Sequence, residues 1–92
     1  MADIRIRLPL QFRGYLGGAE SLQVEAETAG GALAALAARV PGLGERLITP
    51  EGGLRRFVNL YRNDEDVRVL QGLDTPLEDG ATLMILVAMA GG

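Results

Sequence analysis

The chain has 92 residues, of which 48% are apolar and 23% charged, so it can form one small domain around a single core. Its net charge of −3 gives no electrostatic basis for nucleic-acid binding, and no apolar segment approaches the length of a membrane span. No apolar run typical of a signal peptide is visible, and we therefore expect a cytoplasmic protein.

Three residue types that carry much of enzyme chemistry are absent. The sequence has no His and no Cys, and all nine of its cationic residues are Arg. It therefore lacks the commonest general base, a thiol nucleophile and an amine for Schiff-base chemistry. The carboxylates of Asp64-Glu65-Asp66 lack the Gly and distal Glu of a calcium loop, so we interpret them as a solvated turn. We expect no metal site, no bound cofactor and no independent catalytic activity.

The first part of the sequence predicts a β-hairpin. Residues 3–10 alternate between apolar and polar positions, which is typical of a half-buried strand. Its inward side chains are predicted to be Ile4, Ile6, Leu8 and Leu10. A glycine-containing loop at residues 13–18 leads to a second alternating strand at residues 21–26, with Leu22 and Val24 inward.

A helix is predicted next. Thr28 is a suitable N-cap, and the alanine-rich run from Ala32 has high helix propensity. An apolar stripe at helical spacing is predicted to face the sheet, formed by Leu33, Leu36, Ala37 and Val40. Pro41-Gly42 is expected to end the helix. We expect residues 43–56 to form an irregular connection that includes a short helical turn at residues 44–47.

Three more strands are predicted in the second half. Residues 57–62 alternate, and a turn at Asn63-Asp64 leads to a short edge strand at residues 67–70. After a connection that ends in the turn dipeptide Asp79-Gly80, residues 82–87 form a continuous apolar run. Such a run predicts a central strand that is covered on both faces.

This order of elements predicts an α+β fold of the ubiquitin-like β-grasp type. The last strand would lie parallel beside the first, and one main helix would cover one face of a mixed sheet. We assign residues 1–88 to this domain and residues 89–92 to a flexible, free C-terminal tail. The tail carries Gly91-Gly92, whose lack of side chains would let it enter a narrow slot, so that the main-chain carboxylate of Gly92 becomes the reactive group.

Strand parity places a mixed apolar and cationic surface on the sheet face opposite the helix. Its predicted members are Arg5, Arg7, Phe57, Asn59, Tyr61, Met84 and Leu86. We interpret this surface as a docking patch for a partner protein. The alternative is that Phe57, Met84 and Leu86 complete a second small core or a homodimer contact.

Two stretches of the second half resemble a known family. Residues 57–68 form a strand, an acidic turn and a Val-Arg pair, and residues 77–92 run from the Asp-Gly turn through an apolar strand to Gly91-Gly92. Together they resemble the ubiquitin-like sulfur carriers of the MoaD/ThiS type. Glu45-Arg46-Leu47 and Leu54-Arg55-Arg56-Phe57 are most similar to the CysO-type branch of cysteine carriers. Many members carry Pro just before the tail, where this chain has Val87-Ala88-Met89-Ala90.

The resemblance implies a carrier that acts as a co-substrate and is not itself an enzyme. An adenylyltransferase of the MoeB/ThiF type, using ATP and magnesium, would activate the Gly92 carboxylate, and a sulfur donor would convert it to a thiocarboxylate. In the CysO-type branch, a pyridoxal-phosphate-dependent cysteine synthase would accept the sulfur and a metallopeptidase would release the product.

Other functions remain open at this point. The chain could be the small subunit of molybdopterin synthase, with its tail in the large subunit's active site and a pterin precursor as sulfur acceptor. It could also be a ubiquitin-like protein modifier, or a purely structural β-grasp module.

Overall fold

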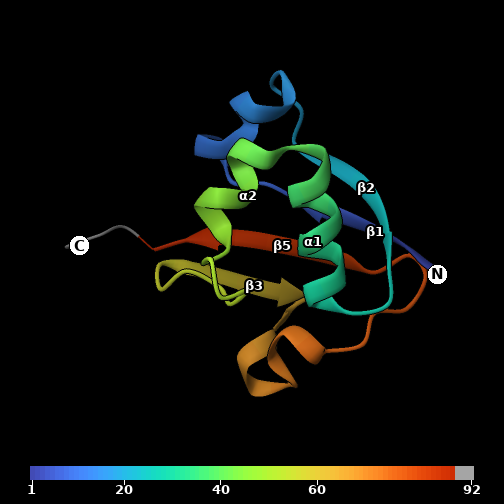
Figure 1. The fold of residues 1–92 in the computed structure, drawn as a ribbon. Coiled ribbons are helices and arrows are strands. Elements are labelled where there is room, and N and C mark those ends of the chain that lie inside the picture. The colour runs from blue at the N-terminus through green and yellow to red at the C-terminus, as the bar shows by residue number, and fades with distance from the viewer. Residues whose placement is uncertain (89–92) are drawn as a thin grey trace.

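The computed structural model describes residues 1–88 and shows a five-stranded sheet packed against helices (Figure 1). The predicted flexible tail at residues 89–92, including Gly91 and Gly92, lies outside the described residues. The strands are β1 (Ala2–Arg7), β2 (Ser21–Ala26), β3 (Val58–Arg62), β4 (Glu65–Asp66) and β5 (Thr82–Val87). The helices are α1 (Ala29–Arg39) and α2 (Pro41–Leu47), with short 3-10 helices η1 (Leu10–Leu16), η2 (Val67–Val69) and η3 (Gly72–Asp74).

The sheet has the strand order β2-β1-β5-β3-β4. β1 and β2 form an antiparallel hairpin in which Arg7 lies opposite Ser21. β5 lies between β1 and β3, parallel to β1 and antiparallel to β3. The predicted β-grasp topology, with the last strand beside the first, is therefore confirmed.

Thr28 begins the main helix as predicted. Its backbone is extended, and its hydroxyl oxygen accepts a 3.0 Å hydrogen bond from the N–H of Gly31. This bond satisfies one of the amide groups that the first turn of a helix leaves unpaired. Leu33 and Leu36 are fully buried against the sheet, as the predicted stripe requires.

The buried stripe of α1 lies nearer its beginning than predicted. Ala29 and Ala32 are fully buried, whereas Ala37 and Val40 are only partly buried. Ala37 packs instead against α2: a Cβ added to Gly44 would come within 2.5 Å of the Ala37 Cβ. A close helix–helix contact therefore takes the place of a contact with the sheet.

The predicted helical turn at residues 44–47 is the end of a longer helix, because a second helix begins at Pro41, and only residues 48–57 form the predicted irregular connection. Pro41 stands in the first turn of α2, where a missing N–H costs no hydrogen bond and the fixed φ suits a helix. Leu43 and Leu47 are fully buried beneath α2. One proline therefore separates two helices that cover the same face of the sheet.

The prediction that Leu10 is an inward strand residue is also wrong. The strand ends at Arg7, and Leu10 is 77% exposed, while Leu8 is 2% exposed. Pro9 cannot donate to the strand ladder, and its carbonyl instead accepts the N–H of Phe12 to start η1. Phe12 is buried in place of Leu10, and the predicted loop at residues 13–18 is mostly part of this 3-10 helix.

Two further corrections concern the second half. The predicted edge strand at residues 67–70 is wrong: the edge strand is Glu65–Asp66, and Val67 is buried at the start of η2. The predicted full coverage of β5 is wrong as well. Leu83 and Ile85 are fully buried, but Leu86 is 39% exposed, so β5 is open on one face. The predicted turn at Asn63-Asp64 is confirmed, with a positive φ of 55° at Asn63.

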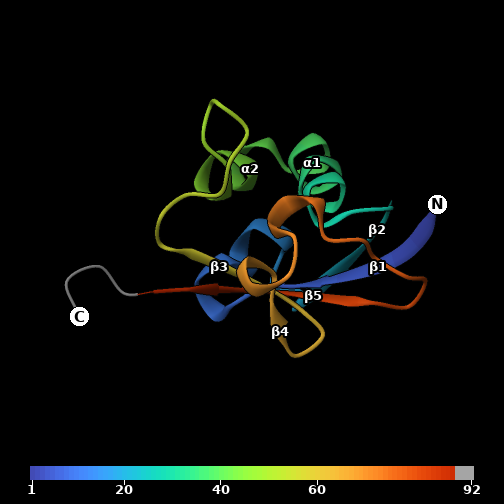
Figure 2. The ribbon, with the colours of Figure 1, turned by 90° about the horizontal axis from the view of Figure 1, so that it is seen from below.

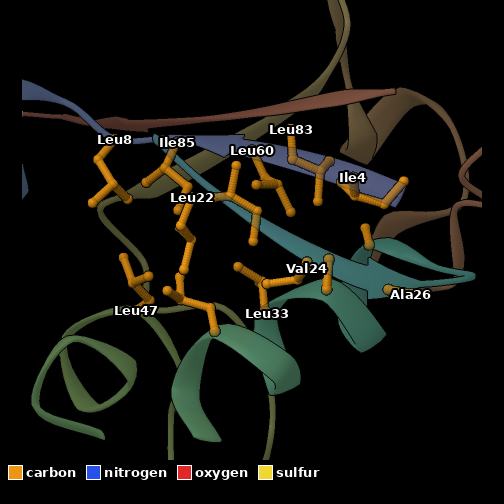
Figure 3. Packing of buried hydrophobic residues seen from close by; sticks show 14 of the residues in the cluster. Ile4, Leu8, Leu22, Val24, Ala26, Leu33, Leu47, Leu60, Leu83 and Ile85 are labelled. Atoms are coloured by element: carbon orange, nitrogen blue, oxygen red, sulfur yellow. The ribbon is translucent and has the colours of Figure 1, made fainter. Parts of the chain in front are cut away.

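The core lies between the sheet and the two helices (Figure 3). Leu33 and Leu47 point toward the sheet from the helical side, and Ile4, Leu60 and Leu83 point toward them from three neighbouring strands. All of these side chains are at most 1% exposed. Burial of apolar surface at about 25 cal/mol per Å² is the main stabilising contribution to such a fold.

Candidate functional site

One face of the sheet is covered by neither α1 nor α2 (Figure 2), and we call it the open face. Figure 2 shows the sheet edge-on, with α1 and α2 on the same side of it. The other side carries the outward side chains of β1, β5 and β3. The seven residues predicted for the docking patch all belong to these strands or adjoin them, namely Arg5, Arg7, Phe57, Asn59, Tyr61, Met84 and Leu86. Strand order and register now fix their arrangement.

A row of three neighbours crosses the centre of the open face. Met84 of β5 lies opposite Arg7 of β1 on one side and opposite Tyr61 of β3 on the other. Because neighbouring strands lie about 4.8 Å apart, the backbones of Arg7 and Tyr61 are separated by about 10 Å. The open face therefore presents an apolar centre between a guanidinium and a phenol.

A second group lies nearer the end of β5. Leu86 is opposite Asn59 on β3, and Phe57 immediately precedes β3. Phe57 and Leu86 are 38% and 39% exposed, which is unusual for large apolar side chains. The N–H of Ala88 donates a 2.8 Å hydrogen bond to the carbonyl of Phe57, so these two side chains lie close to the last described residue.

Arg5 and Arg7 supply positive charge on the β1 side of the open face. Together with Glu20, Ser21 and Thr82 they line a shallow hollow of about 590 Å³. Arg7 forms a 3.6 Å ion pair with Glu20, but both side chains are largely exposed. Exposed pairs of this kind contribute about 0–1 kcal/mol, so the pair does little to prevent Arg7 from contacting a partner.

The structure adds Arg68, which sequence reasoning missed as a site residue. Arg68 lies in η2, and its Nη2 donates to the Asn59 side-chain oxygen at 2.8 Å and to Asp66 Oδ2 at 2.9 Å. Its Nε lies 3.3 Å from each carboxylate oxygen of Asp66. The Asp66-x-Arg68 spacing was visible in the sequence. The contact with Asn59 was hidden because the edge strand was predicted at residues 67–70.

The same contacts shift the pKa values of this pair. The hydrogen bonds from the Arg68 side chain, and then from its backbone N–H, hold the pKa of the Asp66 carboxyl below its usual value. The side-chain hydrogen bond to Asp66 raises the pKa of the Arg68 guanidinium. Both groups therefore stay charged across the physiological range.

Within residues 1–88, no cluster of three or more His, Cys, Asp or Glu side chains could hold a metal ion. The carboxylates after the Asn63 turn belong to separate contacts. Glu65 lies 3.5 Å from Arg62, and Asp66 is held by Arg68. Among the same residues, no helix has the length and apolar character needed to cross a bilayer.

Comparison with known families decides the identity of this fold. A model of the ThiS family matches residues 6–92, which is most of the chain. The chain belongs to the ThiS family. Its resemblance to ubiquitin-like carriers of the MoaD/ThiS type is thereby confirmed.

Among the relatives of this chain, the sulfur carrier protein CysO is similar over nearly the whole chain. Sulfur carrier protein CysO of Mycobacterium tuberculosis (strain ATCC 25618 / H37Rv) is 41% identical over 92 residues, covering 98% of this chain and 99% of the relative. Its crystal structure matches with a TM-score of 0.84 and 40% identity, covering 94% of this chain and 99% of that chain.

Two other relatives extend the comparison. A chain of the crystal structure of the Amycolatopsis orientalis BexX/CysO complex has a TM-score of 0.87 and 38% identity, covering 97% of this chain and 99% of that chain. Small archaeal modifier protein 3 of Haloferax volcanii is 37% identical over 65 residues, which are 71% of this chain and 70% of the relative. The CysO-like character that the sequence suggested is thus confirmed in sequence and in fold.

Proposed function

We propose that this protein is a sulfur carrier whose Gly92 carboxylate is adenylated and then converted to a thiocarboxylate. The observation that carries the proposal is the 41% identity over nearly the full chain to a protein named as a sulfur carrier. The ThiS-family match also runs through Gly91 and Gly92.

In this chemistry the reacting group of the carrier is its main-chain carboxylate, and no side chain of the carrier has to react. A carboxylate is a poor electrophile, so a carboxylate oxygen of Gly92 would attack the α-phosphorus of ATP and expel pyrophosphate. Sulfur from a donor would then attack the acyl carbon and displace AMP, which leaves a thiocarboxylate. ATP and magnesium belong to the activating adenylyltransferase of the MoeB/ThiF type. The carrier itself has no Cys or Lys side chain that could capture the activated acyl group.

Recognition is the contribution of the carrier in this proposal. The apolar centre at Met84, Leu86 and Phe57 is bordered by cationic and aromatic side chains. Such a combination matches the buried centre and polar rim of protein–protein interfaces. Because Ala88 pairs with Phe57, a partner that covers this surface would also lie next to the start of the tail. The open face is therefore our proposed docking surface for the adenylyltransferase.

We propose that the sulfur carried by this protein is used for cysteine biosynthesis. The thiocarboxylate would attack an activated serine derivative on a pyridoxal-phosphate-dependent synthase, and a metallopeptidase would release the product. This assignment follows the CysO-type similarity of the whole chain.

A second candidate is a ubiquitin-like protein modifier, because an archaeal modifier protein is 37% identical over 65 residues. In that case the activated Gly92 would form an isopeptide bond with a lysine of a target protein. The small subunit of molybdopterin synthase is a further alternative, in which the sulfur acceptor is a pterin precursor. The cysteine carrier, the molybdopterin synthase subunit and the protein modifier would all be activated at Gly92 in the same way. They differ in the molecule that accepts the sulfur or the acyl group.

The experiment that separates them follows the activated chain to its acceptor. The thiocarboxylate form is incubated separately with the host's cysteine synthase plus its serine-derived substrate, with the molybdopterin synthase large subunit plus the pterin precursor, and with a cell extract supplied with ATP, which can reactivate the carrier for isopeptide formation. A carrier–cysteine adduct in the first reaction supports the proposal. Transfer of sulfur to the pterin, or isopeptide bonds to lysines in the extract, would favour the corresponding alternative.

A further inference from the structure

The contacts of Arg68 add little to the stability of the fold, but they hold its guanidinium in one position. Arg68 forms an exposed ion pair with Asp66, and its side chain is 64% exposed. Exposed pairs contribute little to stability, and immobilising a long Arg side chain costs conformational entropy. The consequence of the network is therefore geometric: Asp66 and Asn59 together hold the guanidinium at one place.

That place is at the edge of the open face nearest the chain's exit from β5. Asn59, which accepts a hydrogen bond from Arg68, lies opposite Leu86. Leu86 is two residues before Ala88, or about 7 Å along the strand. Arg7 lies opposite Met84, four residues before Ala88. Arg68 is thus bound beside the Asn59–Leu86 pair, two residues before the last described residue.

The guanidinium also keeps unused donors. Among the described residues, its hydrogen bonds to side chains come from Nε and Nη2, and none comes from Nη1. A guanidinium carries five N–H groups in a planar fork that fits a carboxylate or another oxygen acceptor. The two N–H groups of Nη1 are therefore directed away from Asp66 at a fixed orientation.

The charges of the open face indicate which acceptor would fit. Arg5 and Arg7 on β1 share the open face with Arg68, and Arg13 lines a small hollow with Arg7, Met84 and Leu86. The carboxylates of this face are Asp66, held by Arg68, and the exposed Asp3 and Glu25 on β1 and β2, while Glu20 pairs with Arg7. Among residues 1–88, the carboxylate paired with Arg68 is Asp66, so the two remaining N–H groups of Nη1 would fit a carboxylate of a partner and would not fit a cation.

We propose that Arg68 is a specificity-determining residue of the docking surface: held by Asp66 and Asn59, it presents Nη1 to a carboxylate of the activating adenylyltransferase. This inference rests on the proposed function. Because Asp66 balances its charge, Arg68 contributes through the direction of its N–H groups more than through net charge. Lys is a poor substitute, since an ammonium cannot hold both neighbours in the same planar arrangement.

The test uses three variants of the full chain: Arg68→Lys, Asp66→Asn and the double variant. Arg46→Lys is the matched control, because Arg46 is exposed on α2, on the other side of the sheet. The measurements are kcat and KM of the carrier in ATP–pyrophosphate exchange by the host's adenylyltransferase. Thermal unfolding of each variant checks that the fold is retained.

If the fixed orientation of the Arg68 guanidinium matters, Arg68→Lys and Asp66→Asn should each raise KM about tenfold and leave kcat unchanged. A change of about tenfold is the loss expected for one charge-assisted hydrogen bond. The double variant should be no worse than the worse single variant, because both remove the same contact. Attraction by net charge alone predicts the opposite pattern. Arg68→Lys would then leave KM unchanged, and Asp66→Asn would lower it.

The outcomes also separate this inference from the proposed function. If the wild-type chain is adenylated and Arg68→Lys has a KM within twofold of it, the role of Arg68 is overturned and the carrier function stands. If the wild-type chain is neither bound nor adenylated by the enzyme, both proposals fail.

Discussion

The carbonyl of Phe57 accepts a 2.8 Å hydrogen bond from the N–H of Ala88, so the pairing of β3 with β5 extends to the last residue that the structure describes. Val58 and Val87 form the preceding pair. The exposed side chains of Phe57 and Leu86 lie at this same point of the open face. In our account, the residues that recognise a partner are thus directly adjacent to those that deliver Gly92 to it.

Charge reversal at Arg7 should weaken docking. Arg7→Glu places a carboxylate beside Glu20 and removes a cation next to Met84, so we expect at least a tenfold rise in the KM for adenylation with kcat nearly unchanged. Arg46→Glu makes the same change of charge on α2 and should leave KM within about twofold. Equal effects of the two variants in the exchange assay would show that only net charge matters and that the open face is not the docking surface.

Leu8 and Leu10, two positions apart, test whether β1 ends at Arg7. Leu8 is buried and Leu10 is exposed, although both were predicted to face inward. Leu8→Ala should lower the free energy of unfolding by about 2–5 kcal/mol, and Leu10→Ala by less than about 0.5 kcal/mol. Urea denaturation measures both values. Comparable losses for the two variants would contradict the end of β1 at Arg7.

The Asp66–Arg68 pair should make stability depend on pH. The pKa of Asp66 is depressed in the folded state, mainly by hydrogen bonds from Arg68. A carboxyl of this kind stabilises the fold above its unfolded-state pKa, about 4, and this contribution is lost as the pH falls through the lower folded-state pKa. The difference in unfolding free energy between wild type and Asp66→Asn should therefore be present at neutral pH and disappear in acid. Urea denaturation across this range would refute the pairing if the difference stayed constant.

The absence of Lys can be tested by adding one. Gly92 is four residues beyond Ala88, a reach of at most about 14 Å, and Arg56 adjoins Phe57, the partner of Ala88. After adenylation, Arg56→Lys should attack the acyl group and give a self-linked product that has lost one water. Glu78→Lys is the control, because Glu78 precedes β5 and is separated from Ala88 by the length of that strand. Mass spectrometry should find the self-linked product only in Arg56→Lys; its equal formation in both variants would contradict the proximity argument.

Local signals in the sequence predicted much of the fold. The strands at residues 21–26 and 82–87 have the predicted bounds, because alternation and apolar runs depend on neighbouring residues alone. The N-cap at Thr28 was predictable for the same reason, since the N–H of Gly31 that donates to its hydroxyl lies within one turn. The β-grasp topology followed from the order of these elements.

Two of the errors arose at prolines that can either end one element or begin the next. Pro9 ends a strand and starts a 3-10 helix, which turns Leu10 outward. Pro41 ends one helix and begins the next. Hydrophobic alternation and helix propensity do not show whether a proline only ends one element or also begins the next, because tertiary packing decides this.

The candidate site was predicted only in part. Parity predicted that the seven residues of the proposed docking patch share one side of the sheet, since side chains alternate between the two faces inside a regular ladder. Arg68 was missed because its position depends on the side chains of Asn59 and Asp66, which come from two different strands. Contacts between side chains of separate elements require the register of the sheet, and this register was not available before the structure.

The central claim is that the reactive group of this protein is the carboxylate of Gly92. The most direct test is intact-mass and C-terminal peptide mass spectrometry after incubation with ATP, magnesium, a sulfur donor and the host's adenylyltransferase. We predict a mass gain equal to the replacement of one oxygen by one sulfur, located on the peptide that ends in Gly91-Gly92 and absent when Gly92 is deleted. An unchanged C-terminal peptide under conditions in which the enzyme is active would contradict the claim.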